Sequence, residues 1–287
     1  MPQVTSPSYV ARIMKEKGIG AKKGLGQNFL VDRNIVQRIL DHAAVDGESW
    51  VLEIGPGMGA LTWPLAERGA QVVALEIDSE LAAILRETLP HPKITIVEGD
   101  ALSLDWEGAL KDAGWEGQPL ALVANLPYYI TSPLIMKALE CGLPFTAIVV
   151  MVQKEVAERM LADPGSKDFG VLSLAVQYYA QGSLVLKVPR TVFFPPPSVD
   201  SAVVKLEPRP PQVSAPRSQL FAVIRAAFQQ RRKTLRNALK PLLAEWGLEM
   251  EQLDRALARL GLDPRVRGER LSLAEYSQLT EELLKGV

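Results

Sequence analysis

Sulfur and imidazole side chains are scarce in this sequence. Among 287 residues there is one cysteine, Cys141, and there are two histidines, His42 and His91. A single cysteine excludes an internal disulfide and a metal site built from several cysteines. Neither histidine adjoins any of the motifs described below. We therefore expect chemistry that requires no metal ion.

Long apolar runs are also missing. No stretch approaches the roughly 18 consecutive apolar residues of a membrane-spanning helix, and the N-terminus lacks the pattern of a signal peptide. Hydrophobic residues make up 47% and charged residues 23% of the chain, the ordinary balance of a globular protein. The length suits one large domain or two of ordinary size. We expect a globular, cytoplasmic protein, in the form of a monomer.

Charge is distributed very unevenly, although the formal net charge is only −1. Residues 1–40 carry a net charge of +5, and residues 217–240 carry +7 without a single acidic residue. Residues 41–216, which lie between the two basic blocks, carry a net charge of −10, and residues 241–287 carry −3. Two basic blocks that flank an acidic middle indicate a polyanion as the partner.

Residues 50–153 alternate between apolar runs and helical patterns. Each apolar run is short and rich in Val, Ile and Leu, as expected of a buried parallel strand. The expected strands are 50–54, 71–75, 94–97, 120–124 and 146–152. The expected helices between them are 60–68, 79–88 and 131–140. This order predicts an α/β fold with a Rossmann-like, doubly wound parallel sheet.

The flanks of this core are expected to be largely helical. Ser6 followed by Pro7 is typical of a helix start, and Asp32 would cap a second helix. After the core, we expect helices at 153–161 and 171–180 and strands at 183–188 and 201–206, the two strands forming an antiparallel edge of the sheet.

A proline-rich stretch, 208–216, marks the expected domain boundary. Residues 1–207 would form the α/β domain, with a helical N-terminal extension over 1–45. Residues 217–287 read as helical throughout and would form a smaller C-terminal domain. We find no internal repeat.

The five residues Asn125 to Tyr129 follow the expected strand 120–124 and read Asn-Leu-Pro-Tyr-Tyr. The carboxyl end of a parallel strand is where an open α/β sheet places its ligands. An Asn offers a donor and an acceptor, the Pro stiffens the turn, and a Tyr ring gives a flat face for stacking. This set suits a planar base that carries an amino group. It would also suit an ordinary loop with a proline turn and a packed tyrosine.

Glycines and acids end the first three strands. Gly55, Gly57 and Gly59 would let the backbone approach a ligand without a Cβ clash. Glu76 ends the second strand, 21 residues after Gly55, and could bind both hydroxyls of a ribose. Asp100 ends the third strand and could accept a hydrogen bond from an adenine amino group. A nucleoside site at this edge of the sheet is the resulting prediction.

The same acids help to distinguish between cofactors. Nothing after Gly59 supplies the basic residue that a second phosphate would require, which disfavours NADP. A positively charged sulfonium suits an acidic domain in which Glu53 is also near. S-adenosylmethionine is therefore favoured, while NAD stays open on these physical grounds alone.

Beyond these local features, the chain resembles the KsgA-type small-subunit ribosomal RNA adenine dimethyltransferases over nearly its whole length. The resemblance rests on several motifs that occur in the same order. They are Gly26–Leu30, Glu53–Gly59, Glu76, Gly99–Ala101, Asn125–Ile130, Gln153–Ala157, Phe194–Ser201 and Gln230–Leu235.

The resemblance implies methyl transfer from S-adenosylmethionine to two adjacent adenosines in the 3'-terminal hairpin of 16S ribosomal RNA. Each would become N6,N6-dimethyladenosine during small-subunit biogenesis. Residues 1–207 would bind the cofactor and catalyse, and residues 217–287 would bind RNA. The implied cofactor-binding residues are Asn28, Leu30, Gly55, Glu76, Asp100 and Asn125. The implied catalytic and target-binding residues are Asn125, Leu126, Pro127, Tyr128 and Phe194.

The nearest related branch is the Erm-type methyltransferases, which modify an adenosine of large-subunit ribosomal RNA. That branch usually has Ile where this chain has Leu126 and Ser where it has Gly26, so the KsgA branch is favoured. Tyr129 departs from the Asn that is common in both branches. Two further alternatives are a ribosome-assembly or RNA-binding factor without catalysis and a small-molecule methyltransferase.

Basic side chains in both positive blocks are candidate contacts to RNA phosphates. If residues 225–236 form one helix, Arg225, Arg232 and Arg236 share a face, because steps of seven and four residues return to one side. Phosphate contacts of this kind position an RNA without reading its sequence. The candidates are Lys22, Lys23, Arg225, Arg231, Arg232, Lys233 and Arg236.

Overall fold

A computed structural model describes residues 4–285, with the side chain of Lys23 left out of the description. The chain divides into two compact units, which are described separately below. Unit 1 comprises residues up to Ala157 together with Gln181–Pro208, and unit 2 comprises Glu158–Ala180 with the residues from Arg209 onward. Between residues 4 and 285, no helix is long and apolar enough to cross a membrane.

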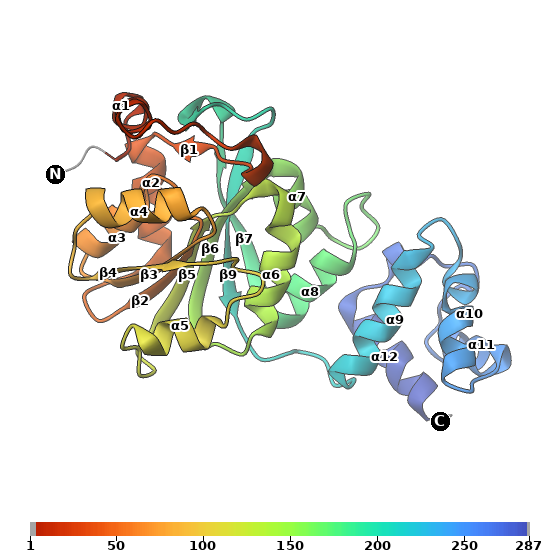
Figure 1. Cartoon of the computed structure of the whole chain (residues 1–287). Helices are drawn as coiled ribbons and strands as arrows, with labels where there is room; N and C mark the ends of the chain where they lie inside the picture. Colours follow the sequence, from red (N-terminus) through yellow and green to blue (C-terminus); the bar gives the residue numbers. More distant parts are fainter. Residues whose placement is uncertain (1–3, 286–287) are drawn as a thin grey trace. The chain divides into compact units, whose positions relative to one another are not determined.

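Unit 1 is built on a seven-stranded sheet whose order is β4-β3-β2-β5-β6-β9-β7 (Figure 1). Its strands are β2 (Trp50–Ile54), β3 (Gln71–Glu76), β4 (Ile94–Glu98), β5 (Leu120–Asn125), β6 (Phe145–Gln153), β7 (Ala180–Val188) and β9 (Ser201–Pro208). Strands β2 to β6 pair in parallel, which confirms the predicted doubly wound core. The central strand β2 is buried at every residue, because helices cover both faces of a parallel sheet.

The register of the parallel strands aligns their carboxyl ends. Leu75 on β3 pairs with Ile54 on β2 and with Val97 on β4, and Glu76 pairs with Glu98. On the other side of β2, Asn125 at the end of β5 pairs with Met151. The residues that follow these strands therefore emerge along one edge of the sheet.

Five helices connect or follow these strands. They are α3 (Thr62–Glu67), α4 (Ser79–Thr88), α5 (Trp106–Asp112), α6 (Thr131–Glu140) and α7 (Lys154–Met160). Helix α3 is shorter than the expected 60–68, because turns continue from Gly57 to Leu61. Helix α5 was not expected. Only two of its residues, Trp106 and Leu110, are buried, which leaves too few apolar positions for a helical pattern.

The N-terminal helices begin where their capping residues predict. In α1 (Pro7–Lys17) the Ser6 hydroxyl accepts a hydrogen bond from the Tyr9 amide at 3.1 Å. In α2 (Arg33–Ala43) the Asp32 carboxylate accepts from the Asn34 and Ile35 amides at 2.8 and 3.0 Å. Both side chains satisfy amides that have no partner within their own helix.

The late strands of unit 1 reverse direction, as the sequence predicts. Strand β9 pairs with β6 in an antiparallel manner, and β7 lies beyond it at the edge of the sheet. A second, two-stranded sheet was not expected. It pairs β1 (Phe29–Leu30) with β8 (Phe193–Phe194), so that Phe29 faces Phe194 in the register.

Apart from Ala180, the first residue of β7, the regular structure of unit 2 within the described residues is helical. It contains α8 (Val171–Tyr179), α9 (Arg217–Gln229), α10 (Leu235–Glu245), α11 (Met250–Arg259) and α12 (Leu273–Leu284). Its core is held by aromatic contacts, among them Phe169 with Phe228 and Tyr178 with Phe221. The buried Tyr276 hydroxyl donates to the Gly268 carbonyl at 2.9 Å.

The sequence-based boundary of 1–207 differs from this division at residues 158–180. These residues, including α8, join the C-terminal helices because the aromatic side chains of α8 and of the preceding turn pack on α9. The amide of Arg209 also donates to the Tyr179 carbonyl at 2.9 Å. A single boundary drawn along the sequence cannot reveal that residues 158–180 belong with the C-terminal helices.

Residues 225–236 do not form one helix, so the condition for a shared face of the three arginines is not met. Helix α9 ends at Gln229, and α10 begins only at Leu235. Between them the Lys233 amide donates to the Gln230 carbonyl at 2.8 Å, which closes a turn. Residues 230–234 are polar or charged and provide no apolar face to hold a helix. Arg225, Arg232 and Arg236 therefore do not share a helical face.

Candidate active site

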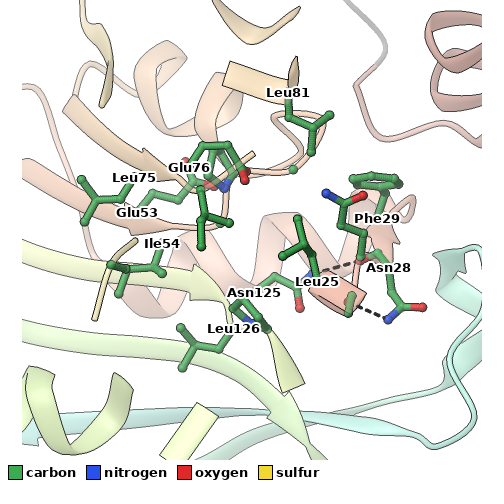
Figure 2. A pocket seen from close by; sticks show the side chains of 18 of the residues that line it. Leu25, Asn28, Phe29, Glu53, Ile54, Leu75, Glu76, Leu81, Asn125 and Leu126 are labelled. Atoms are coloured by element: carbon green, nitrogen blue, oxygen red, sulfur yellow. Dashed lines mark hydrogen bonds between the residues drawn. The ribbon is translucent and has the colours of Figure 1, made fainter. Parts of the chain in front are cut away.

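A cavity opens at the carboxyl edge of the parallel strands of unit 1 (Figure 2). Its empty volume is about 940 Å³, part of it open to solvent. Five stretches contribute lining residues, within 25–30, 53–61, 75–81, 99–101 and 125–130. All six predicted cofactor-binding residues line it, as do Leu126, Pro127 and Tyr128. Residues far apart in the sequence are thus brought together.

The glycine loop forms the floor of the cavity where the chain leaves β2. Gly55 and Gly57 have φ values of +67° and +58°, which side chains rarely adopt. A Cβ atom on Gly57 would lie 3.0 Å from the Phe29 ring, and one on Gly55 would lie 3.7 Å from the Pro127 ring. The loop therefore exposes bare backbone between two flanking walls.

Glu76 lies at the end of β3 with only 5% of its surface exposed. One of its carboxylate oxygens, Oε1, accepts a hydrogen bond from the Asp78 amide at 2.9 Å. Burial raises the pKa of Glu76 to about 7, despite the backbone amides that stabilise its charge. A hydroxyl-bearing ligand would supply further donors to this partly desolvated carboxylate.

Asp100 follows β4 and is half buried in the lining. Its Oδ1 accepts from the Leu102 amide at 2.9 Å, so a tight turn orients the carboxylate. Lys137 on α6 holds the next residues of that turn. Its ammonium donates to the carbonyls of Ala101, Leu102 and Leu104 at 2.9, 2.9 and 2.7 Å. All three ammonium hydrogens are thereby used to fix the loop beside Asp100.

Glu53 is the most deeply buried acid of the site, with 1% of its surface exposed. Its Oε2 has no hydrogen-bond partner, and it lines the cavity. Burial raises the pKa of Glu53 to about 8, and repulsion from Glu76 adds to the effect. Sequence reasoning noted this residue only as a nearby charge. An acid in the middle of an apolar strand is the signal that identifies it.

Asn125 ends β5 and is tied to the N-terminal segment. Its side-chain nitrogen donates to the Asn28 carbonyl at 3.2 Å, and the Asn28 side chain donates to the Gly26 carbonyl at 3.0 Å (Figure 2). Because a carbonyl only accepts, the Asn125 nitrogen must be the donor here. The Asn125 oxygen is then the end of the amide that can accept from a ligand.

The loop after Asn125 is held by its own backbone. The Leu126 amide donates to the Met151 carbonyl at 3.0 Å, which continues the pairing of β5 with β6. The Thr131 hydroxyl at the start of α6 donates to the Pro127 carbonyl at 2.9 Å. These bonds fix the loop on both sides of Pro127.

The two tyrosines of this loop have different environments. The hydroxyl oxygen of Tyr128 lies 2.6 Å from that of the fully buried Ser201, and burial raises the pKa of Tyr128. Tyr129 is 52% exposed at the mouth of the cavity and lies beside Gly26. Burial, together with Asp100 and Glu76, raises the pKa of Tyr129.

Phe194 does not line the cavity. Its strand β8 pairs with β1, and its half-buried side chain packs with the cluster that contains Phe29. The role in target binding that the resemblance implies for Phe194 therefore stays a prediction.

Among the basic candidates of the N-terminal block, Lys22 already has protein partners. Its ammonium lies 2.8 Å from Asp78 Oδ1 and 2.7 Å from Glu80 Oε2. The side chain of Lys23 lies outside the description.

The candidates of the second block fall into two groups. Arg231 pairs with Glu269 at 2.9 Å and donates to the Lys167 carbonyl. Arg236 makes two hydrogen bonds to Asp254, at 2.7 and 3.0 Å. The remaining three, Arg225, Arg232 and Lys233, are exposed.

These features fit S-adenosylmethionine. The glycine backbone leaves room for a ligand chain, Glu76 and Asp100 can accept from a nucleoside, and the unpartnered oxygen of Glu53 suits a cationic group. The acceptor oxygen of Asn125 lies in the same cavity and suits an amine.

Known proteins of one family resemble this chain. The model of a family described as ribosomal RNA adenine dimethylase matches residues 19–285. The ribosomal RNA small subunit methyltransferase A of Bacillus thuringiensis (strain Al Hakam) is 47% identical over 287 residues, covering 99% of this chain and 98% of that protein.

Two solved structures are similar over 89% of this chain, both at 28% identity. One is a dimethyladenosine transferase from Plasmodium falciparum, with a TM-score of 0.72 and 97% of that chain covered. The other is the 23S rRNA methyltransferase ErmE, with a TM-score of 0.65 and 99% covered.

Proposed function

Because the chain belongs to the family of ribosomal RNA adenine dimethylases, we propose that it dimethylates two adjacent adenosines in the 3'-terminal hairpin of 16S ribosomal RNA. The methyl donor is S-adenosylmethionine, the products are N6,N6-dimethyladenosines, and the reaction belongs to small-subunit biogenesis. The 47% identity to a small-subunit enzyme supports this target over a large-subunit one. Leu126 and Gly26 support the same branch.

The observation that carries the proposal is the fixed orientation of Asn125. The Asn28 carbonyl holds its nitrogen at 3.2 Å and leaves its oxygen as an acceptor in the cavity. An acceptor at that place recognises an amino group such as the 6-amino group of adenine, where guanine carries a carbonyl oxygen.

The residues that would hold the methyl donor line one continuous cavity. Glu76 would bind the ribose hydroxyls and Asp100 the adenine amino group. Gly55 would lie beneath the methionine part, with Asn28 and Leu30 covering the cofactor. When bound there, S-adenosylmethionine supplies an electrophilic methyl group on its sulfonium.

The adenine amine is a poor nucleophile because its lone pair is delocalised into the ring. The Asn125 oxygen and the Leu126 carbonyl would each accept a hydrogen bond from one of its two N–H groups. Those bonds strengthen as positive charge develops on the nitrogen, so they stabilise the transition state more than the ground state. The fixed loop around Pro127 keeps both acceptors in place and aligns the amine for in-line attack.

The target base must leave its stack to reach this cavity. The Tyr128 ring would stack on it, and such stacking contributes about 1–3 kcal/mol per base. Phe194 would approach from the opposite side. In the second methylation only one N–H remains, so one of the two acceptors loses its partner.

The RNA outside the cavity would be held through phosphates by exposed side chains of unit 2, namely Arg225, Arg232 and Lys233. The shape of the folded RNA or of the assembling subunit would supply the remaining specificity. We place the reaction in the cytoplasm and expect the protein to act as a monomer.

Transfer of labelled methyl groups to hypomethylated small subunits tests the proposal. Mapping should find label on two adjacent adenosines of 16S RNA, with two methyl groups on each. Label on large-subunit RNA would instead indicate the Erm-type reaction. Label on neither, despite binding to the subunit, would indicate an assembly factor.

The Asn125→Ala variant tests the mechanism in the same assay. We expect methyl transfer to fall by at least about a hundredfold, in the range for loss of a transition-state acceptor. S-adenosylhomocysteine should still bind, because Glu76 and Asp100 are unchanged. Undiminished transfer by this variant would contradict the role of Asn125.

A further inference from the structure

Asp78 is a buried carboxylate just outside the candidate active site. It follows Glu76 by two residues and precedes α4, and only 2% of its side chain is exposed. Its Oδ1 accepts from the Glu80 amide at 3.2 Å, an ordinary helix cap. A cap alone requires neither this degree of burial nor a charge, since Asn and Ser cap helices equally well.

The other contacts of Asp78 come from the N-terminal segment. Lys22 Nζ donates to Oδ1 at 2.8 Å, and Gln27 Nε2 donates to Oδ2 at 3.0 Å. The segment closes on itself at the same place, because the Lys22 amide donates to Gln27 Oε1 at 2.7 Å. One carboxylate thus binds both ends of a six-residue stretch, 22–27.

The backbone of Asp78 contacts the other wall of the cavity. Its amide donates to Glu76 Oε1 at 2.9 Å. The residue that binds the N-terminal segment through its side chain therefore orients, through its backbone, the acid assigned to the ribose.

The segment bound in this way covers the cavity. Leu25 to Leu30 all line it, and the Asn28 carbonyl at its far end holds the Asn125 amide. Side chains of residues 22–27 join this stretch to the turn between β3 and α4. The described contacts that do so include the hydrogen bonds of Lys22 and Gln27 to Asp78.

We propose that Asp78 is a positioning residue that fastens the segment 22–30 over the bound cofactor through Lys22 and Gln27. The proposal rests on the cofactor assignment made above. In this role Lys22 binds Asp78 of the same chain. Its position in a basic block instead predicts a contact to an RNA phosphate.

Charge supports this geometry. Burial acts to raise the pKa of Asp78, but the hydrogen bonds from Lys22 and Gln27 outweigh it, so the pKa is lowered overall. The hydrogen bonds to Asp78 and Glu80 raise the pKa of Lys22. Hydrogen bonds between charged groups are stronger than neutral ones, and a buried partner is less screened by salt.

Three variants separate the possible roles. Asp78→Asn keeps the helix cap and the amide that binds Glu76, and it removes the negative charge beside Lys22 and the oxygen that accepts from Gln27. Lys22→Met removes the ion pairs with both Asp78 and Glu80 from a half-exposed position where loss of folding is not expected. Glu80→Gln is the matched control, because it removes the exposed second partner of Lys22 and leaves Asp78 unchanged.

The first measurement is the affinity for S-adenosylhomocysteine by calorimetry, without RNA. We expect Asp78→Asn and Lys22→Met to weaken binding by about tenfold, the loss of one charge-assisted hydrogen bond. Glu80→Gln should bind as the unchanged protein does. The second measurement is amide hydrogen exchange, in which the same two variants should lose protection at residues 22–30 while α4 keeps its protection.

Two results would overturn the proposal. One is unchanged affinity and unchanged exchange at 22–30 in both variants. The other is that Lys22→Met weakens only RNA binding and reduces its salt dependence by about one unit, the behaviour of a phosphate contact. If the unchanged protein itself fails to bind S-adenosylhomocysteine, the proposed function fails instead, so the two failures are distinguishable.

Discussion

The hydroxyl oxygens of Tyr128 and Ser201 lie 2.6 Å apart, which joins the loop after β5 to the first residue of β9. Ser201 is fully buried and pairs with Gln153 at the end of β6, so it has little freedom to move. A tyrosine whose hydroxyl is held at one end has a fixed ring axis. The direction in which the Tyr128 ring points would therefore be set in part by a residue of another strand.

Removing this hydrogen bond should reduce RNA methylation. We expect Ser201→Ala and Tyr128→Phe each to lower kcat/KM for the small subunit by about three- to tenfold, the effect of one hydrogen bond. The double variant should be no worse than either single one, because both changes remove the same contact. Affinity for S-adenosylhomocysteine serves as the control and should not change. Additive losses in the double variant would contradict the coupling.

Cofactor affinity should depend on pH through Glu76. Because burial raises its pKa to about 7, this acid is largely protonated at pH 6 in the free protein and largely ionised at pH 8. The ionised form would accept both ribose hydroxyls, so affinity for S-adenosylhomocysteine should rise by up to about tenfold from pH 6 to pH 8. Calorimetry at both pH values checks this, and Glu76→Gln should bind more weakly with a flatter pH profile. A Glu53→Gln control shows whether the second acid contributes.

Stability of the free protein should fall as the pH rises through the titration of Glu53. Its pKa is raised to about 8, so the folded state holds a proton that the unfolded state has already released. This contribution to stability is fully present below about pH 4.5 and is lost as the pH rises through 8. Urea unfolding measures the free energy of unfolding at pH 5 and at pH 9. The decrease between the two pH values should be smaller by about 2–4 kcal/mol in Glu53→Gln than in the unchanged protein. An identical loss in both proteins would place the ionisation elsewhere.

Lys137 should affect how the adenine of the cofactor is recognised. Without its ammonium, the carbonyls of Leu102 and Leu104 lose this donor, Ala101 keeps only the Trp106 indole N–H, and the turn that carries Asp100 should loosen. We expect Lys137→Met to bind S-adenosylhomocysteine about tenfold more weakly and to discriminate less against the analogue with hypoxanthine in place of adenine. Lys137→Arg should recover part of the discrimination. A variant that is merely less stable, with unchanged discrimination, would contradict this role.

The arginines of the second basic block should separate into two classes. Arg232 is exposed, so Arg232→Ala should weaken RNA binding and lower its salt dependence by about one unit. Arg236 is paired with Asp254, so Arg236→Ala should mainly lower the melting temperature, and Asp254→Asn should do the same. Filter binding at several salt concentrations and thermal unfolding test both expectations.

Much of the fold follows from local patterns in the sequence. The apolar runs at 50–54 and 120–124 are buried on both faces, and no other element accommodates such runs so well. Ser6 and Asp32 cap helices through contacts within three residues, so their roles depend on nothing distant. The placement of Glu76 and Asp100 in one cavity follows from the parallel order of their strands.

The features that sequence reasoning missed depend on distant partners. Strand β1 forms only because Phe29 meets Phe194, 165 positions away in the chain. Lys22 appears as a free cation in the sequence, and its partner Asp78 becomes apparent only once α4 is in place. Helix α9 ends after Gln229 because residues 230–234 have no apolar side chains to bury. A count of charges does not reveal this. The assignment of α8 to unit 2 depends likewise on rings that meet only in the folded chain.

The contact between Asn125 and Asn28 has a consequence for errors in substrate choice. An unrestrained amide can rotate by half a turn and then offers a hydrogen where it had offered an oxygen. In that state the cavity would favour the keto edge of a guanine or a uracil. The Asn28 carbonyl, 97 residues earlier in the chain, holds the amide against this rotation. The choice between a base edge with an amino group and one with a carbonyl would thus be decided in part by a backbone atom that would not itself contact the RNA.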